Sequence, residues 1–430
     1  MESIVVKGGR RLSGEVVIDG AKNSALPLIA ATLLAESGSC HLDNVPDLRD
    51  INTIICLLEG MGAVIQRQGR RLEIKTAAVD NCQAPYELVK TMRASILVLG
   101  PLMARFGKAR VSLPGGCAIG ARPVNLHIKG LEVMGARISV EHGYIIGQAG
   151  RLKGADISFD LTTVTGTENL MMAAVLADGA TTLRNAAREP EIVDLAAFLR
   201  KMGAQIEGDG THTITITGVE KLSAADYQVM PDRIEAGTFM VAAGISDGDV
   251  VIENAPLAAM GSVVAKLQEI GLLIEPLSAY QEDELLAGVA VRVRRSAEGL
   301  RGLDVKTMPY PGFPTDMQAQ VMVLLALVQG TSVISETVFE NRFMHVFELQ
   351  RMGADIEVEG RTAIVRGVVA LSGAPVMASD LRASAGLVLA GLAAEGETVM
   401  SRVYHLDRGY AGFEKKLKAL GADVERVEAN

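Results

Sequence analysis

The sequence predicts an α+β fold made of two domains, each containing three repeats of helices and strands. The first observation is a phrase that recurs six times, for example as LEGMGA at Leu58–Ala63 and LQRMGA at Leu349–Ala354. Each copy is typical of the end of an amphipathic helix, where glycine adopts the left-handed conformation. Successive copies are 68 to 82 residues apart, a spacing longer than most solenoid repeats. Their glycines are Gly62, Gly135, Gly203, Gly271, Gly353 and Gly421.

The second observation is an alternating apolar and polar segment after each phrase, such as Ala354–Glu359. This pattern predicts a half-buried strand, followed by a glycine-containing turn and usually by a second strand. The sixth repeat ends before its closing strand. Because Ser3–Gly14 resembles Ala363–Gly373, we expect the N-terminal segment to complete the last repeat. We therefore predict one domain at residues 22–230, with repeats 1 to 3, and another at residues 1–21 plus 231–430, with repeats 4 to 6.

The third observation is a helical segment between phrases that is apolar nearly all round. A helix without a polar face has to be buried, so we expect three such helices inside each domain with the sheets around them. The segments are Ser24–Leu34, Ser95–Ala104, Leu170–Leu176, Ala236–Ala243, Ala319–Leu327 and Ser384–Ala394.

The composition excludes several classes of function. Aromatic residues make up only 4% of the 430 residues and the net charge is -9, which disfavours nucleic acid as a partner. The longest apolar stretches, such as Val321–Val328, are too short to span a bilayer, and no signal peptide is recognisable. The four cysteines show neither CxxC spacing nor an accompanying histidine pair. We expect a soluble protein of a reducing cytoplasm without a structural metal.

The segment Leu113–Pro123 contains three glycines and two prolines, which predicts a loop. Within it Arg122 follows Cys117 by five residues; the cation would favour the thiolate and could also bind an anionic substrate, while the glycines would let the loop close as a lid. The alternative is a small apolar cysteine at an ordinary corner. His127 is predicted to be a hydrogen-bond donor in a loop, because no second histidine lies at metal-ligand spacing.

Charged and hydroxyl residues stand at the starts of the apolar helices. A cation at a helix start costs stability against the helix dipole unless an anion binds there. If helices of both domains direct their amino ends at one cleft, the site fits a phosphate or carboxylate; for any single residue, surface charge is the alternative. Neither GxxxxGK[ST] nor GxGxxG is present, so a kinase or dehydrogenase cradle is excluded. The residues are Lys22, Asn23, Lys90, Arg93, Thr163–Glu168, Arg233, Asp316, Asp380 and Arg382.

Pro311 and Pro314 rigidify the approach to Asp316, which suits a carboxylate that accepts a proton from a hydroxyl group. The alternative is that Asp316 caps a helix. Arg342 and Arg408 are candidates for the anion site, with ion pairs between the domains as the alternative.

Six motifs spread over the chain are specific enough to compare with known families. They are Gly20–Ser24, Leu113–Pro123, Ala187–Glu191, Pro311–Gln320, Glu340–His345 and Asp407–Tyr410. Together they closely resemble the UDP-N-acetylglucosamine 1-carboxyvinyltransferase family of enolpyruvyl transferases, over essentially the whole chain. The resemblance implies two inverse α/β barrels (α/β prisms) of three repeats each. It implies transfer of the enolpyruvyl group of phosphoenolpyruvate to the 3′-hydroxyl of UDP-N-acetylglucosamine, with release of phosphate and no cofactor, in a bacterial cytoplasmic monomer.

The resemblance also implies roles for individual residues. Cys117 matches the proton donor to C3 of phosphoenolpyruvate and Asp316 the acceptor of the sugar hydroxyl proton, while Asp380 would hold the closed cleft and assist proton transfer. Lys22, Arg122 and Arg408 match residues that hold the phosphate, and Arg342 and Arg382 would face the carboxylate. The nucleotide sugar would contact Asn23, Arg93, Arg122, Pro123, Val124, Asn125, Leu126, Thr163, Val164, Thr165, Asp316 and Val338. Asn125 stands where many members carry aspartate, but its amide oxygen can accept from the uracil N3–H group.

Two alternatives remain at this stage. The sister family, 5-enolpyruvylshikimate-3-phosphate synthase, shares the fold and the donor but not the cysteine loop. A non-catalytic anion-binding protein could also use the same repeats. The resemblance further implies the first committed step of peptidoglycan synthesis, roles in cell shape, cell division and the cell cycle, and sensitivity to fosfomycin.

Overall fold

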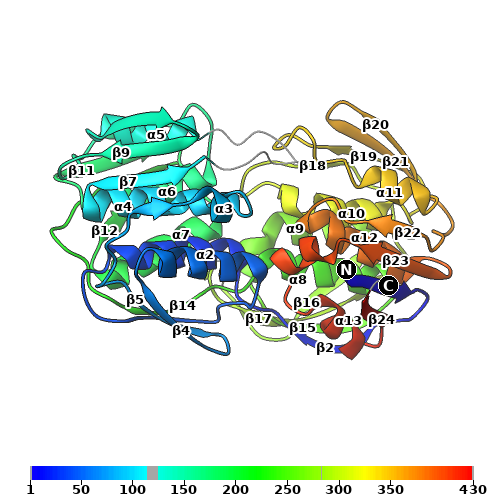
Figure 1. Cartoon of the computed structure of the whole chain (residues 1–430). Coiled ribbons are helices and arrows are strands. Elements are labelled where there is room, and N and C mark those ends of the chain that lie inside the picture. Colours follow the sequence, from blue (N-terminus) through cyan, green and yellow to red (C-terminus); the bar gives the residue numbers. More distant parts are fainter. Residues whose placement is uncertain (1, 114–123, 282, 429–430) are drawn as a thin grey trace. The chain divides into compact units, whose positions relative to one another are not determined.

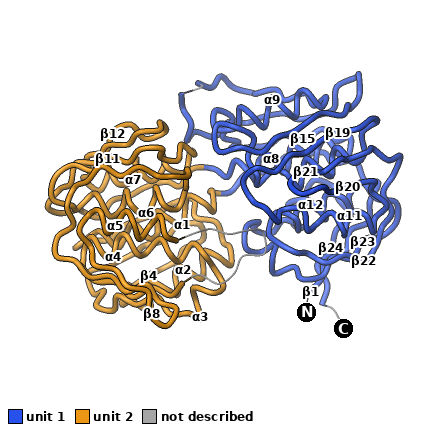
Figure 2. The backbone as a smooth tube through the Cα atoms, turned by 90° about the horizontal axis from the view of Figure 1, so that it is seen from above, with its two compact units in different colours: residues 1–19, 117–121, 231–430 blue, residues 20–116, 122–230 orange. Residues whose placement is uncertain are grey.

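The computed structural model describes residues 2–113, 124–281 and 283–428. The contacts among these residues divide the chain into two compact units (Figure 2). Unit 1 contains residues 2–19 and those described from 231 to 428, and unit 2 contains residues 20–113 and 124–230. Each unit is described by itself.

The described strands form six four-stranded sheets that share one topology. In each sheet an inner strand pairs in parallel with an edge strand on one side and antiparallel with a second inner strand on the other, and this second strand pairs antiparallel with the other edge strand. In the first repeat, β3 (Cys40–Asp43) pairs in parallel with β14 (Asp226–Gln228) and antiparallel with β5 (Arg71–Lys75), which pairs with β4 (Val64–Gln68). Because β14 follows the third repeat, the repeats of unit 2 are joined in a closed ring.

The ring of unit 2 is completed by two sheets of the same order. The edge strand of each is supplied by the segment that precedes the repeat. These strands are β6 (Gln83–Ala84), β7 (Lys108–Ser112), β9 (Tyr144–Gln148) and β8 (Arg137–Glu141), then β10 (Asp156–Ser158), β11 (Ala180–Arg184), β13 (Thr213–Thr217) and β12 (Gln205–Glu207).

Both ends of the chain enter the sheets of unit 1 (Figure 1). β1 (Glu2–Lys7) lies between β23 (Glu397–Ser401) and β24 (Asp423–Glu428), antiparallel to both, so it supplies the strand that the sixth repeat lacks. β2 (Ser13–Val17) is the parallel edge strand beside β15 (Asp249–Ala255). The other strands of unit 1 are β16 (Leu272–Pro276), β17 (Val289–Arg295), β18 (Val305–Lys306), β19 (Thr331–Ser335), β20 (Asp355–Glu359), β21 (Thr362–Arg366) and β22 (Pro375–Met377).

The apolar helices lie inside the units, as predicted. Every residue of α8 (Arg233–Ile245) is buried, and α8 packs against α10 (Gln318–Leu325) and α12 (Leu381–Ala393), which contact each other (Figure 1). A 3₁₀ turn, η4 (Thr315–Met317), leads into α10. The interior helices of unit 2 are α1 (Lys22–Ala31) with η1 (Thr32–Leu34), η2 (Arg93–Val98) with α4 (Leu99–Phe106), and α6 (Val164–Ala174).

The recurring phrase ends the second helix of each repeat, as predicted. Its six glycines have φ between 91° and 116°, which only glycine adopts readily. These helices are α2 (Arg49–Gly60), α5 (Asn125–Val133), α7 (Pro190–Met202), α9 (Gly261–Ile270), α11 (Val346–Arg351) and α13 (Phe413–Ala419), and the remaining short turns are α3 (Tyr86–Val89), η3 (Leu257–Met260) and η5 (Val403–Arg408). None of the described helices has both the length and the apolarity needed to cross a membrane.

Two of these glycines in unit 1 allow a matched test. A Cβ atom on Gly271 would lie 2.3 Å from the carbonyl oxygen of Gly299, whereas one on Gly353 would have no neighbour within 4 Å. Gly353→Ala should lower the free energy of unfolding by about 1 to 2 kcal/mol through its left-handed conformation alone. Gly271→Ala should cost at least about 1 kcal/mol more, because backbone must also move. Urea unfolding measures both, and equal losses would contradict this account.

Candidate active site

The predicted site residues fall into one group in each unit. Cys117, Arg122 and Pro123 lie outside the described residues. The group in unit 1 is Asp316, Val338, Arg342, Asp380, Arg382 and Arg408, and the group in unit 2 is Lys22, Asn23, Arg93, Val124, Asn125, Leu126, Thr163, Val164 and Thr165.

In unit 1 the carboxylate of Asp316 binds two arginine side chains. Arg342 Nη2 donates to its Oδ1 over 3.0 Å, and Arg382 Nε donates to its Oδ2 over 3.1 Å. The two arginine side chains are 5% and 2% exposed, while that of Asp316 is 24% exposed. The N-cap positions nearby belong to Pro314 and Met317. Asp316 is therefore not a helix cap but a partly accessible carboxylate held by two buried cations.

Both arginines keep unused hydrogen-bonding groups beside Asp316. Nη1 of Arg342 and Nη1 of Arg382 are buried and have no hydrogen-bond partner among the described residues. Buried guanidinium groups are normally fully bonded, and their planar N–H pairs match carboxylate and phosphate oxygens. These donors could bind an anion, and an anion site beside Asp316 stays a prediction.

The start of α12 fixes one of these arginines. Asp380 is the N-cap, and its Oδ1 accepts from the backbone N–H groups of Arg382 at 2.9 Å and Ala383 at 3.1 Å. Arg382 thereby sits in the first turn, where its guanidinium carbon lies 5.3 Å from the centre of the Tyr410 ring. Asp380 acts here as a structural cap, and its role in proton transfer stays a prediction. Arg408 is the last residue of η5.

The site residues of unit 2 lie at helix starts. Lys22 is the first residue of α1, and its Nζ lies 3.4 Å from Oδ2 of Asp50, with both side chains largely buried. Thr163 caps α6 by accepting from the N–H group of Gly166 at 3.2 Å. Arg93 begins η2, and Asn125 begins α5. Because η2 contacts α1 and α6, and α5 contacts α6, these starts belong to one packed group of helices.

The prediction that His127 lies in a loop is wrong. It lies within α5 rather than in a loop, because the helix already begins at Asn125. Its ring is buried, with Nδ1 2.8 Å from Asn169 Nδ2, which donates to it, and Nε2 3.5 Å from Thr165 Oγ1. Burial lowers the pKa of His127 to about 4. His127 is thus a neutral group that supports the start of α6.

Sequence reasoning included Glu168 only as part of the Thr163–Glu168 helix start and did not single out Asp194. Burial, and then the neighbouring Glu191 and Glu189, raise the pKa of Glu168 well above its usual value. Asp194 accepts from Tyr227 Oη at 2.6 Å, from the Met230 N–H group and from Ser24 Oγ, and burial raises its pKa to about 6. An aspartate on the apolar side of α7 is the signal that could have revealed it.

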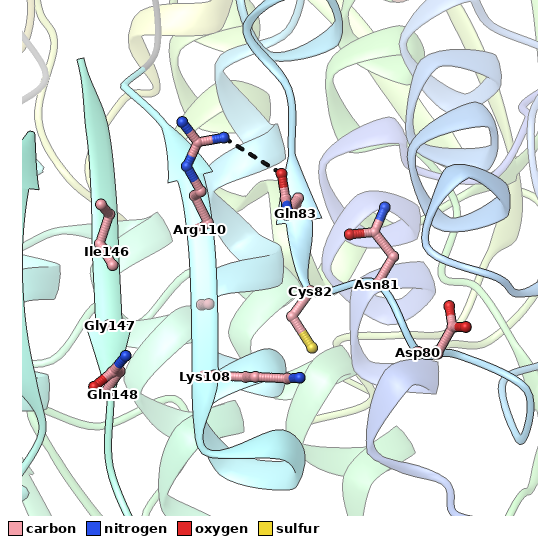
Figure 3. Close-up of a pocket in the computed structure, with 10 residues that line it drawn as sticks. Asp80, Asn81, Cys82, Gln83, Lys108, Arg110, Ile146, Gly147 and Gln148 are labelled. Carbon is pink, nitrogen blue, oxygen red and sulfur yellow. Dashed lines mark hydrogen bonds between the residues drawn. The ribbon is translucent and has the colours of Figure 1, made fainter. Parts of the chain in front are cut away.

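A pocket of about 230 Å³ lies elsewhere in unit 2, on the sheet of the second repeat (Figure 3). None of the predicted site residues lines it. Lys108 extends past the thiol of Cys82, and Arg110 bonds to Gln83 (Figure 3). Burial raises the pKa of Cys82, which disfavours a reactive thiolate. In the part of the chain that the structure describes, no three His, Cys, Asp or Glu residues converge as a metal site.

Comparison with solved structures identifies the class of protein to which this fold belongs. The enolpyruvyl transferase NikO from Streptomyces tendae matches with a TM-score of 0.88 and 26% identity, covering 100% of this chain and 99% of that one. An EPSP synthase from Acinetobacter baumannii matches over 100% of both chains with a TM-score of 0.76 and, at 19% identity, shows the fold alone. The predicted fold class, two domains of helices and small sheets, is thereby confirmed.

Sequence comparisons identify the family more narrowly than the structural comparison does. The family model for EPSP synthase (3-phosphoshikimate 1-carboxyvinyltransferase) matches residues 6–417. Proteins named UDP-N-acetylglucosamine 1-carboxyvinyltransferase are 58% identical in Geotalea uraniireducens, over 100% of both chains, and 57% identical in Magnetococcus marinus, over 99% of this chain and 100% of that one. The chain belongs to the enolpyruvyl transferase family, in the branch of the UDP-N-acetylglucosamine 1-carboxyvinyltransferases.

The buried imidazole of His127 predicts a pH dependence. In the unfolded chain His127 titrates near its ordinary pKa of 6.5, whereas in the folded protein it does so near 4. The unfolded state therefore binds a proton first as the pH falls, and stability is lost between about pH 6.5 and pH 4. His127→Gln should remove about 2 kcal/mol of the loss between pH 7 and pH 5. Urea unfolding at both values checks this, with His212→Gln in an exposed turn as the control; equal pH dependence in both variants would contradict it.

Proposed function

We propose that this chain transfers the enolpyruvyl group of phosphoenolpyruvate to the 3′-hydroxyl of UDP-N-acetylglucosamine and releases phosphate. The observation in the structure that supports this best is Asp316 between two buried arginines with unfilled donors. Such an arrangement can bind an anionic donor and place a carboxylate base within reach of a hydroxyl group. The identity to relatives with this name over the whole chain selects the nucleotide sugar as acceptor.

The proposed steps balance as an addition followed by an elimination. Asp316 accepts the proton of the 3′-hydroxyl while the oxygen of that hydroxyl group bonds to C2 of phosphoenolpyruvate. Cys117 donates a proton to C3. This gives a tetrahedral ketal. The Cys117 thiolate then takes a proton from C3, the bond between C2 and the phosphate oxygen breaks, and the proton held by Asp316 passes to the leaving phosphate. This forms the enol ether and restores both side chains, with Asp380 assisting proton transfer.

The charged side chains would bind the donor, and the helix starts of unit 2 would bind the nucleotide sugar. We assign Arg342 and Arg382 to the carboxylate of phosphoenolpyruvate and Lys22, Arg122 and Arg408 to its phosphate, because guanidinium and ammonium groups neutralise charge that develops in the ketal. The free N–H groups at a helix start favour an anion such as the diphosphate. The acceptor would contact Asn23, Arg93, Arg122, Pro123, Val124, Asn125, Leu126, Thr163, Val164, Thr165, Asp316 and Val338.

In the cell we place this reaction in the bacterial cytoplasm, as the first committed step of peptidoglycan synthesis. The cell-wall product would connect the enzyme with cell shape, cell division and the cell cycle. We expect a monomer that needs no cofactor and no nucleic acid or membrane partner.

A second acceptor is worth testing because the matching family model is named for 3-phosphoshikimate. Phosphate release from phosphoenolpyruvate should require UDP-N-acetylglucosamine, and shikimate 3-phosphate should not replace it. Activity with shikimate 3-phosphate alone would favour the alternative, and no phosphate with either acceptor would favour a binding protein.

Replacing one buried arginine should affect the donor selectively. Arg342→Gln removes a charged partner of the phosphoenolpyruvate carboxylate and should reduce kcat/KM for phosphoenolpyruvate by a factor that corresponds to about 2 to 4 kcal/mol. Calorimetric binding of UDP-N-acetylglucosamine should change much less. The control is Arg292→Gln, which breaks an ion pair with Asp249 on the surface of the same unit. Equal losses for both substrates would place Arg342 outside the donor site.

The role of Cys117 is tested by changing its acidity. Cys117→Asp should retain turnover, because a carboxylic acid can also donate a proton, whereas Cys117→Ser should lose most of it, since a hydroxyl group is far too weak an acid. Fosfomycin should alkylate Cys117 in the unmodified enzyme and leave Cys117→Asp active. Phosphate release and peptide mass mapping decide this, and full activity in Cys117→Ser would remove the thiol from the mechanism.

A further inference from the structure

Glu336, directly after β19, connects two segments of unit 1 through one buried carboxylate. The residue is 1% exposed. Its Oε1 accepts from Thr307 Oγ1 at 2.8 Å, from the Val338 N–H group at 2.8 Å and from the Phe339 N–H group at 3.1 Å. Its Oε2 accepts from Thr315 Oγ1 at 2.8 Å. Four donors from three stretches of chain thus meet on one side chain.

A carboxylate matches this arrangement. A carboxylate side chain offers about four lone-pair positions, so four donors can all be bonded. A glutamine could keep the two backbone bonds through its oxygen and donate to the Thr315 hydroxyl, which can also accept, whereas an alanine would remove the partner of all four donors. A buried donor that loses its partner costs more than an exposed one, so with alanine the structure would have to rearrange locally.

The two segments that Glu336 joins both carry proposed acceptor contacts. Thr315 precedes Asp316 in η4, and Val338 lies in the loop that Glu336 itself begins. The other side of the turn is held by Gln320, whose Nε2 donates to the Asp316 carbonyl oxygen at 2.9 Å. The Asp316 backbone is therefore held on both sides, and of these two side chains Glu336 is the one that also bonds the Val338 loop. Thr337 adds a second attachment of that loop, because its N–H group donates to Thr307 Oγ1 at 2.9 Å.

We infer that Glu336 is a positioning residue that sets the spacing between the Asp316 carboxylate and the Val338 loop, and thereby the placement of the acceptor hydroxyl. This inference rests on the proposed function. Glu336 acts through its neighbours and touches neither substrate. Its loss should therefore impair use of the acceptor sugar and the proton transfer from it more than binding of phosphoenolpyruvate.

Kinetics with both substrates varied separate this role from general support of the fold. Glu336→Ala should raise the KM for UDP-N-acetylglucosamine at least about tenfold and lower kcat, while the KM for phosphoenolpyruvate changes less than about threefold. Thr315→Val, which removes one donor and keeps the shape, should shift both values in the same direction, and Thr315→Ser should restore them. The matched control is Asp304→Asn, a carboxylate that accepts from the Val333 N–H group on β19 before Ser335, and it should leave all three constants unchanged.

Amide hydrogen exchange provides a readout that does not depend on turnover. Loss of the two backbone bonds in Glu336→Ala should speed exchange at Val338 and Phe339 by at least about tenfold, with little change in strand β21. An unmodified enzyme without activity on either acceptor would refute the proposed function, and this exchange would still test the anchoring. Equal increases in both KM values in Thr315→Val, or unchanged exchange in Glu336→Ala, would overturn the inference, and Thr315→Val alone decides it if Glu336→Ala does not fold.

Discussion

The burial of helices without a polar face is the constraint on which the rest of this structure depends. Such helices cannot lie on a surface, so each unit surrounds them with sheets. Each repeat contributes an edge strand to the sheet of the next repeat, and this exchange closes the ring. Once the sides of the helices are covered, their ends remain as the places where polar groups can gather. The repeat architecture therefore decides where chemistry can occur before any catalytic residue is considered.

Near those ends buried charge occurs in two ways. Glu336, which follows β19 and bonds Thr315 at the start of η4, has its donors supplied by the fold, whereas Arg342 and Arg382 each keep a buried N–H group without a partner among the described residues. Leaving such groups unsatisfied is unfavourable for folding, and a bound anion would recover part of that cost. The same region of unit 1 thus combines side chains held rigidly by hydrogen bonds with buried cations that would favour binding of an anionic substrate.

Much of this could be predicted, because the recurring phrase and the apolar segments reflect physical requirements that act locally. A glycine with positive φ and a helix that must be buried leave direct marks in the sequence. Asp316 was a candidate base and Arg342 and Arg382 were candidate anion-binding residues before the resemblance was considered. Their pairing could not be predicted, since Arg342 and Arg382 are 26 and 66 residues away from Asp316 along the chain. His127 was wrongly predicted to lie in a loop, because Pro123 ends the glycine- and proline-rich segment but does not indicate that a helix begins two residues later, at Asn125. The site residues beyond these contacts remain proposals.

The pairing of β1 with β23 and β24 also has a consequence for how the protein folds during its synthesis. β1 is translated nearly 400 residues before its partners β23 and β24. At roughly 5 to 20 residues per second, this segment waits about 20 to 80 seconds with its pairing edges unmet. Unit 2, described at residues 20–113 and 124–230, can fold during that interval. A chaperone that shields a short apolar N-terminal strand would therefore protect the nascent chain at its most vulnerable stage.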